Sequence, residues 1–210
     1  VFAYLNPEYN FPKLSNKDFE FNGTRIGHVL IPCSQKVTND FKFNKSGEIY
    51  IITGSNMSGK STFLRTLGIN LSLAYAGGVV NADSFNISLL KIFTCIKVSD
   101  SVIDGISYFY AEVKRLKQLL VLLEEGGSFP VIFFVDEIFK GTNNIERRIG
   151  SRSYLKSLIG KKAVGIVSTH DIELAKLENS YAQIYNYHFR EEIQNDKMAF
   201  DYKLRAGACP

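Results

Sequence analysis

A short stretch with two glycines separates an apolar run from a long helical pattern, and it constrains the fold more than any other feature of the chain. The stretch is Gly54–Ser61, GSNMSGKS, and it fits the pattern G-x-x-x-x-G-K-[ST]. The run before it, Glu48–Thr53, is mostly apolar and β-branched, as in a buried strand. The pattern after it, from about Gly59 to Tyr75, places leucines on one helical face and ends at two glycines. A strand, a glycine loop and a helix in this order predict an α/β fold.

The same pattern is typical of loops that bind phosphate. Gly54 and Gly59 allow a tight turn in which backbone N–H groups converge on phosphate oxygens. Lys60 is placed to reach the terminal phosphates of a nucleotide, and the Ser61 hydroxyl is placed to bind Mg²⁺. The alternative is a chance match of the octapeptide, against which the predicted strand and helix on either side argue. The remaining candidate nucleotide-binding residues are Ser55, Asn56, Met57, Ser58 and Thr62.

Further along the chain, strand-like and helix-like segments alternate. Val131–Val135 and Ala163–Ser168 read as strands buried on both faces. A helix is expected from Ser107 to about Glu124, with Glu112 on its polar side. The apolar positions of a third expected helix are Ile145, Ile149, Leu155, Leu158 and Ile159. This order predicts a mainly parallel sheet flanked by helices.

The two ends of the chain differ from this alternation. Residues 1–46 show no clear period, and the run Ile26–Pro32 is expected to be an edge strand. In the tail, Tyr181–Ile193 and Lys197–Leu204 are rich in aromatic residues and are expected to pair as a hairpin across Asn195-Asp196. Both ends would therefore add antiparallel edge strands to the sheet.

Polar side chains follow both of the later strands. Asp136 and Glu137 end the first, and His170 comes directly after the second. Ligands of parallel sheets bind beyond the carboxyl ends of the strands. There, Asp136 would hold Mg²⁺ directly or through water, Glu137 would orient or deprotonate an attacking water, and His170 would sense a γ-phosphate. The alternatives are two acids that favour a helix N-terminus and a buried, hydrogen-bonded histidine. His28 and His188 are expected to be structural.

Composition excludes several classes of protein. Of the 210 residues, 45% are hydrophobic and 22% are charged, which is ordinary for a globular domain and excludes a disordered chain. No apolar run approaches the ~20 residues of a membrane span, so a membrane protein is excluded. The net charge of +4 permits nucleic acid binding without indicating it. Cys33, Cys95 and Cys209 lie far apart, as expected in a reducing compartment such as the cytoplasm. Because the chain begins at Val1 rather than at methionine, we expect a piece of a longer protein.

Several motifs, in this order along the chain, resemble the ATPase domain of the MutS family of DNA mismatch-repair proteins, a branch of the ABC ATPases. The phosphate loop shares the unusual Asn56-Met57 pair. The other matching segments are Ile92-Phe93-Thr94, Asp100, Ser107–Val113, Asp136-Glu137 with Gly141-Thr142, Ser168-Thr169-His170, Asn186–Phe189 and Arg205–Ala208. The resemblance covers about residues 25–210, which we assign to one ATPase domain. Residues 1–24 would then be an irregular lead-in from a preceding domain.

The resemblance implies a P-loop NTPase of ABC type that hydrolyses ATP with Mg²⁺. Lys60 and the loop would hold the phosphates, Ser61 and Asp136 would bind Mg²⁺, Glu137 would activate water, and His170 would monitor the γ-phosphate. In this family two ATPase domains pair head to tail, so a homodimer is expected. In it, Ser107 would contact, in trans, the nucleotide held by the partner. Mismatched double-stranded DNA would bind to regions outside this chain, and ATP-driven dimerisation would be coupled to that binding.

Departures from the family pattern lie mainly where partner contacts are expected. The signature stretch has Tyr108 and Tyr110 where the family usually has Thr and Met, and the segment after Thr142 also differs. Ser55 replaces a usual proline, and an adenine-stacking aromatic seen in the family is not evident near Lys36. Two alternatives stay open: a nucleotide-gated dimerisation switch with negligible hydrolysis, and an ABC motor of another system. A row of basic side chains is either a DNA-facing strip or the solvated face of a helix: Arg147, Arg148, Arg152 and Lys156.

Overall fold

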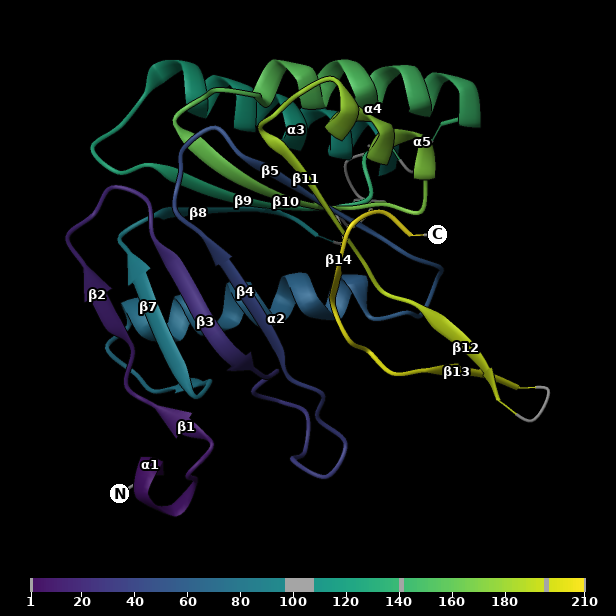
Figure 1. Ribbon diagram of the computed structural model, residues 1–210. Helices are drawn as coiled ribbons and strands as arrows, with labels where there is room; N and C mark the ends of the chain where they lie inside the picture. Colours follow the sequence, from purple (N-terminus) through teal and green to yellow (C-terminus); the bar gives the residue numbers. More distant parts are fainter. Residues whose placement is uncertain (1, 97–107, 140–141, 195–196, 210) are drawn as a thin grey trace.

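A six-stranded, mainly parallel sheet runs through the middle of the protein (Figure 1). The computed structural model describes residues 2–96, 108–139, 142–194 and 197–209. Strands β11, β5, β10, β9 and β8 lie parallel in that order, and β14 pairs antiparallel with β11 at one edge. The bounds are β5 Ile49–Thr53, β8 Lys91–Cys95, β9 Val131–Asp136, β10 Ala163–Ser168, β11 Ile184–His188 and β14 Arg205–Ala206. The expected α/β class, with a mainly parallel sheet and an antiparallel edge, is confirmed.

Helices cover both faces of this sheet because its central strands are apolar at successive positions. In β5, Ile49 and Ile51 enter one hydrophobic core, and Tyr50 and Ile52 enter the other. The first core lies under α3 (Tyr108–Glu125), α4 (Asn144–Leu158) and the short α5 (Ile172–Ala175), and the second lies against α2 (Lys60–Tyr75) (Figure 1). The sheet is therefore enclosed by helices on both sides, as parallel sheets require.

A second, smaller sheet packs against α2. Its order is β2-β7-β3-β4, with β2 Lys13–Ser15, β3 Phe21–Ile26, β4 Asn39–Phe43 and β7 Ser84–Ser88. Phe21, at its centre, contacts the rings of Phe41, Phe43 and Phe85, which join the core beside α2. Before it lie the short helix α1 (Phe2–Leu5) and β1 (Tyr9–Asn10), which pairs with β6 (Val80–Asn81).

The N-terminal expectations need correction at the level of elements. The expected edge strand Ile26–Pro32 is wrong: the strand ends at Ile26, and turns follow it. Residues 1–24, expected to be irregular, include β2 and the first part of β3, because aromatic side chains without a helical period here cover the face of α2. The assignment of this segment to a preceding domain stays a prediction.

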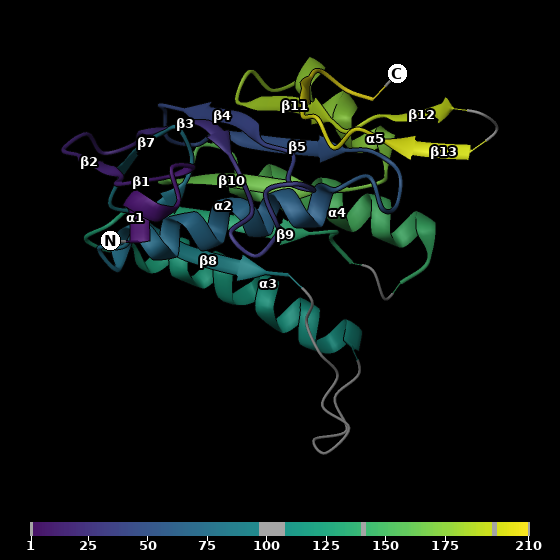
Figure 2. The ribbon, with the colours of Figure 1, turned by 90° about the horizontal axis from the view of Figure 1, so that it is seen from below.

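The tail is a hairpin only in part. β11 joins the central sheet beside β5 instead of pairing with the next segment, because Ile184 and Asn186 are buried against its core. The hairpin consists of β12 (Glu191–Gln194) and β13 (Lys197–Phe200), and it extends away from the central sheet (Figures 1 and 2). A 3₁₀ helix, Lys176–Asn179, connects α5 to this region.

Two helical faces differ from the sequence expectation. Ile145 and Ile149 of α4 are 74% and 63% exposed, and the buried face is formed by Ser151, Tyr154, Leu155 and Leu158. The isoleucines lie in the first turns of α4, on the side away from the residues that pack on the sheet. In α3, Glu112 is buried rather than solvated. Apolar spacing therefore predicted the positions of both helices in the sequence, but it did not predict correctly which residues of each helix are buried.

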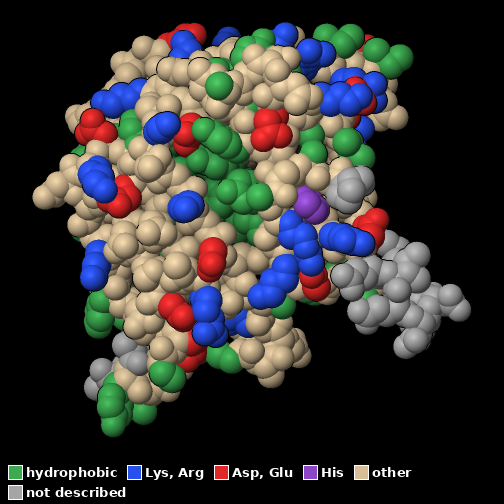
Figure 3. Space-filling view, viewed as in Figure 1, with side chains coloured by type: hydrophobic (Ala, Val, Ile, Leu, Met, Phe, Trp, Pro, Cys, Tyr) green, Lys and Arg blue, Asp and Glu red, His purple; other side chains and the backbone are tan. Residues whose placement is uncertain are grey.

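Hydrophobic side chains also gather near the middle of one face of the protein, where β4 and β11 lie (Figure 3). Between β5 and β11, Tyr50 stacks on Tyr185 with ring centroids 5.3 Å apart, and the Tyr50 hydroxyl donates to Glu48. Across the described ranges, no helix is both long and apolar enough to cross a membrane.

Candidate functional site

The glycine loop connects β5 to α2, as the sequence predicted. Gly54 and Gly59 both have positive φ, +144° and +107°. A Cβ atom on Gly54 would lie 2.8 Å from the carbonyl oxygen of Phe189, so the backbone passes too close there for any other residue. Gly59 is the N-cap of α2 and gives the helix no side-chain cap. The first N–H groups of α2 are thus left to bind an anion.

Lys60 lies inside this loop. The residue is buried, and its ammonium group donates to the carbonyl oxygens of Gly54, at 2.8 Å, and Ser55, at 2.7 Å. A buried cation beside a helix N-terminus concentrates positive charge at one point of the surface. To reach a phosphate, the ammonium group would exchange these carbonyl oxygens for phosphate oxygens.

Three oxygen-bearing side chains meet at the carboxyl edge of the sheet. One comes from the first turn of α2, and the other two come from the ends of β9 and β10. The hydroxyl of Ser61 donates to Asp136 Oδ1 at 2.9 Å, and the hydroxyl of Ser168 donates to the same oxygen. Ser168 is the register partner of Asp136 in the sheet, and both are buried. Carboxylate and hydroxyl oxygens are the ligands that Mg²⁺ prefers. Ser168 is a partner of Asp136 that the sequence marked only as the polar end of a strand.

Glu137 and His170 lie beside this cluster. The Glu137 backbone N–H donates to Ser168 O at 3.1 Å, and its carboxylate Oε1 lies 3.3 Å from His170 Nδ1. The Glu137 side chain is 16% exposed and that of His170 is 39% exposed, so both are accessible to a small molecule. The imidazole of His170 therefore lies directly beside the carboxylate of Glu137.

A cavity of about 720 Å³ lies beside these residues, and Lys60, Ser61 and Glu137 are part of its lining. The rest of the lining comes mainly from the glycine loop and the start of α2, from the segment 26–39 and from two aromatic residues of the tail. The segment and the tail contribute Ile26, His28, Leu30, Ile31, Val37, Asn39, Phe189 and Tyr202. The sequence did not indicate this wall. Its residues come from opposite ends of the chain, and the apolar run at 26–32 was the one signal that fell within it.

Two contacts place the aromatic part of this wall. The Tyr202 ring lies beside Gly59, where a Cβ atom would be 3.1 Å from it. The side chain of Asn39 donates to Tyr202 O at 3.0 Å and accepts from the Leu204 N–H at 2.7 Å. On the facing segment, burial, with Arg65 and Lys36, lowers the pKa of His28 and so favours its neutral form.

The loop contains hydroxyl groups that suit a phosphate ligand. The side-chain oxygens of Ser55 and Ser58 are buried, and among the described residues neither has a hydrogen-bond partner. Buried polar atoms without partners are rare in folded proteins, so both hydroxyls are available to hydrogen-bond a ligand. With the buried ammonium of Lys60 and the oxygens of Ser61 and Asp136, this donor and acceptor set fits a magnesium nucleotide.

The remaining predicted residues of the loop also border the cavity. Asn56 and Met57 are exposed at the tip of the loop, and they line the cavity together with Thr62. Ser107, Asp100 and Gly141 lie outside the described residues. His188, expected to be structural, has its Nδ1 2.9 Å from Gly207 O.

Fold and site together define an α/β protein whose glycine loop and acidic strand ends share one cavity at the carboxyl edge of a mainly parallel sheet. A family model described as MutS domain V matches residues 50–210. The chain is 32% identical to the DNA mismatch repair protein MutS of Geobacillus sp. (strain WCH70) over 97% of its length, and 32% identical to that of Orientia tsutsugamushi (strain Boryong) over 99%. The chain belongs to the MutS family. It spans 23% and 24% of the length of these two relatives.

Proposed function

We propose that this chain binds and hydrolyses ATP as the P-loop ATPase domain, of ABC type, of a MutS-like mismatch-repair protein. The observation that carries the proposal is that Lys60, Ser61 and Glu137 line one cavity at the carboxyl edge of the sheet. Asp136 lies directly behind them, hydrogen-bonded to Ser61. Membership of the family supports it, because the relatives are named as DNA mismatch repair proteins.

Each residue has a chemical task in the proposed reaction. Lys60, the loop N–H groups and the hydroxyls of Ser55 and Ser58 bind phosphate oxygens. Ser61 and Asp136 would hold Mg²⁺, which when bound offsets the negative charge of the phosphates. Glu137 orients or deprotonates the attacking water. His170, within reach of the same carboxylate, senses whether a γ-phosphate is present.

The apolar and aromatic residues of the cavity lining suit the nucleobase. Tyr202 presents an aromatic ring beside the loop, and such a ring gains by stacking on a base. Tyr202 would thus supply the adenine-stacking aromatic that is not evident near Lys36.

ATP would act by changing the association of two domains in the cytoplasm. A second copy is the expected partner, with Ser107 of each copy in contact with the nucleotide of the other. Mismatched double-stranded DNA would bind to parts of the protein outside this chain and respond to the dimer.

Sedimentation velocity of the Glu137→Gln variant, with and without ATP and Mg²⁺, tests the proposal. A dimer that forms with ATP, and that a Lys60→Ala control does not form, supports a composite ATPase site. ATP turnover by the unmodified protein that Glu137→Gln abolishes separates an enzyme from a nucleotide-gated switch with negligible hydrolysis. Failure of the unmodified protein to bind nucleotide contradicts the proposal.

A further inference from the structure

Glu112 of α3 places a charged side chain where burial is unfavourable. The residue is 1% exposed, and its Oε1 accepts the backbone N–H of Phe139 at 2.6 Å. Burial of a carboxylate is tolerated only where hydrogen bonds replace its water, and a bond from N–H to a charged acceptor is stronger than a neutral one. The contact therefore links α3 firmly to the segment that follows β9.

That segment, Glu137–Phe139, carries the proposed water-activating carboxylate. Glu137 and Phe139 both have positive φ, +60° and +57°. Residues with a Cβ rarely adopt this conformation. It persists only where the surrounding structure holds it in place, and it is common at functional sites.

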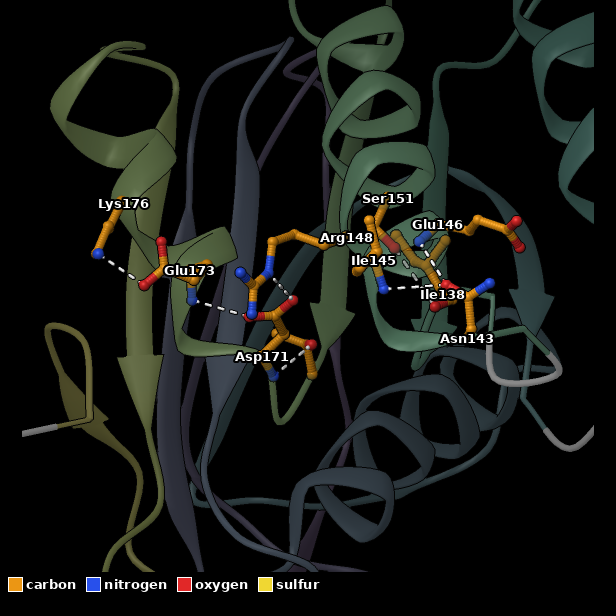
Figure 4. Close-up of polar contacts among 10 residues, drawn as sticks. Ile138, Asn143, Ile145, Glu146, Arg148, Ser151, Asp171, Glu173 and Lys176 are labelled. Carbon is orange, nitrogen blue, oxygen red and sulfur yellow. Dashed lines mark hydrogen bonds and ion pairs between the residues drawn. The ribbon is translucent and has the colours of Figure 1, made fainter.

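Among the described residues, three hydrogen bonds connect the segment to β10, α4 and α3, one to each. They are Glu137 N to Ser168 O (3.1 Å), Ser151 Oγ to Ile138 O (3.4 Å; Figure 4) and Phe139 N to Glu112 Oε1 (2.6 Å). The bond to Glu112 is the shortest of the three and has a carboxylate acceptor. The Phe139 ring adds contacts to Phe109 of α3 and Tyr154 of α4, with ring centroids 6.4 and 6.2 Å apart.

We propose that Glu112 is a positioning residue for ATP hydrolysis, whose buried carboxylate fixes the turn that aims Glu137. The inference deepens the proposed function and rests on it. It also gives α3 control of the hydrolytic site. The helix begins at Tyr108, directly after the serine expected to meet a partner's nucleotide, so a shift of α3 would be passed through Glu112 to the turn.

The test replaces the carboxylate in steps and measures ATP turnover per nucleotide-binding site. Glu112→Gln keeps an oxygen acceptor of the same reach, and we expect kcat within about threefold of the unmodified protein. Glu112→Leu keeps the volume and removes the acceptor. We expect kcat to fall about 10- to 100-fold with the ATP dissociation constant unchanged, because small displacements of a reacting group are costly. Glu124→Leu, on an exposed position of the same helix, is the matched control.

A second readout does not depend on turnover. Hydrogen exchange of the Phe139 amide should become faster in Glu112→Leu and stay slow in Glu112→Gln and Glu124→Leu. A merely structural role would lower thermal stability and the fraction of binding-competent protein, but not the rate per competent site. If Glu112→Leu does not fold, Glu112→Asp, which keeps the charge but is one methylene shorter, is expected to lower kcat while retaining ATP binding.

The outcomes separate this inference from the function on which it rests. If Glu137→Gln abolishes turnover while Glu112→Leu and Glu112→Asp leave the rate per site intact, the inference is wrong and the proposed function stands. If the unmodified protein has no turnover above that of Glu137→Gln, both are wrong. A fall in rate with Glu112→Gln equal to that with Glu112→Leu also contradicts the inference, because the amide retains the acceptor.

Discussion

At the scale of single residues, Gly54 combines two constraints that can be measured separately. Its φ is +144°, and a Cβ there would lie 2.8 Å from both Phe189 O and the Ser58 hydroxyl. Gly77 also has positive φ, +75°, but nothing lies within 4 Å of its Cβ position. We expect Gly77→Ala to lower the free energy of unfolding by about 1–2 kcal/mol, from backbone strain alone. Gly54→Ala should cost about 2–4 kcal/mol, because overpacking adds to the strain. Urea unfolding of both variants measures the difference, and equal losses would contradict the close approach.

Ser168 offers a test of the magnesium site that spares the candidate ligands. Its hydroxyl donates to Asp136 and so orients the carboxylate without being one of the predicted ligands. Loss of such an orienting bond typically weakens metal binding about 10- to 100-fold. We therefore expect Ser168→Ala to weaken nucleotide binding in Mg²⁺ by that factor and to leave binding in EDTA unchanged, as measured with a fluorescent ATP analogue. Ser72→Ala, which removes an exposed hydroxyl bonded within α2, is the control. An equal loss with and without Mg²⁺ would count against a metal site at Asp136.

At the scale of elements, the sequence was informative where one physical rule governed a segment. Continuous apolar runs identified the central strands β5, β9 and β10, because a strand covered on both faces has no polar side. The glycine pattern identified the loop, because φ and close approach both require glycine at Gly54. Hydrophobic periodicity gave the wrong environment for Glu112 and Ile149. It assigns polar residues to the surface and apolar residues to the core, so it cannot predict a buried, hydrogen-bonded carboxylate or an exposed isoleucine.

The residues of the cavity wall could not be predicted from local sequence patterns, for a different reason. Asn39 and Tyr202 lie 163 residues apart and meet only after both sheets have formed. Nothing in the local pattern of either segment indicates the other. The meeting of Lys60, Ser61, Asp136 and Glu137, by contrast, could be predicted because each of them ends or follows a strand of the same parallel sheet.

The two bonds of Asn39 lead to a prediction about the tail. They attach the segment after β13 to β4, and without them Tyr202 would lose the support that keeps it on the cavity wall. We expect Asn39→Ala to weaken ATP binding about tenfold and to leave kcat at saturating ATP unchanged. Each lost bond is worth about 1 kcal/mol. Titration of nucleotide and steady-state turnover measure the two effects. Asn39→Asp retains the acceptor for Leu204, so its ATP affinity should lie between those of the unmodified protein and Asn39→Ala. A fall in kcat without a loss of ATP affinity would contradict a role of Tyr202 in binding the nucleobase.

At the scale of the whole molecule, α4, which carries two exposed isoleucines, contacts the turn after β9 through Ser151 and Tyr154. Ile145 and Ile149 are among the most exposed large apolar residues described, and neighbouring Arg148 is paired with Asp171 (Figure 4). Adjacent apolar side chains that remain exposed beside a charged helix often mark an interaction surface. If ATP brings two copies together, this end of α4 is a surface that association can bury. The exposed isoleucines therefore favour contact with a protein, rather than with DNA, at the first turns of α4.

The corresponding prediction concerns association alone. Ile149→Asp should abolish the ATP-dependent dimer of the Glu137→Gln variant, because it places a carboxylate in an interface that excludes water. Nucleotide affinity and thermal stability of the monomer should stay as they are, since the side chain contributes little to the core.

Phe129→Asp is the control: it changes a similarly exposed apolar residue in the loop between α3 and β9 and should leave the dimer intact. Sedimentation velocity with ATP and Mg²⁺ distinguishes the cases. A dimer that still forms with Ile149→Asp would contradict an interface at α4. Loss of the dimer in both variants would show that added charge prevents association, and it would also contradict a specific interface at α4.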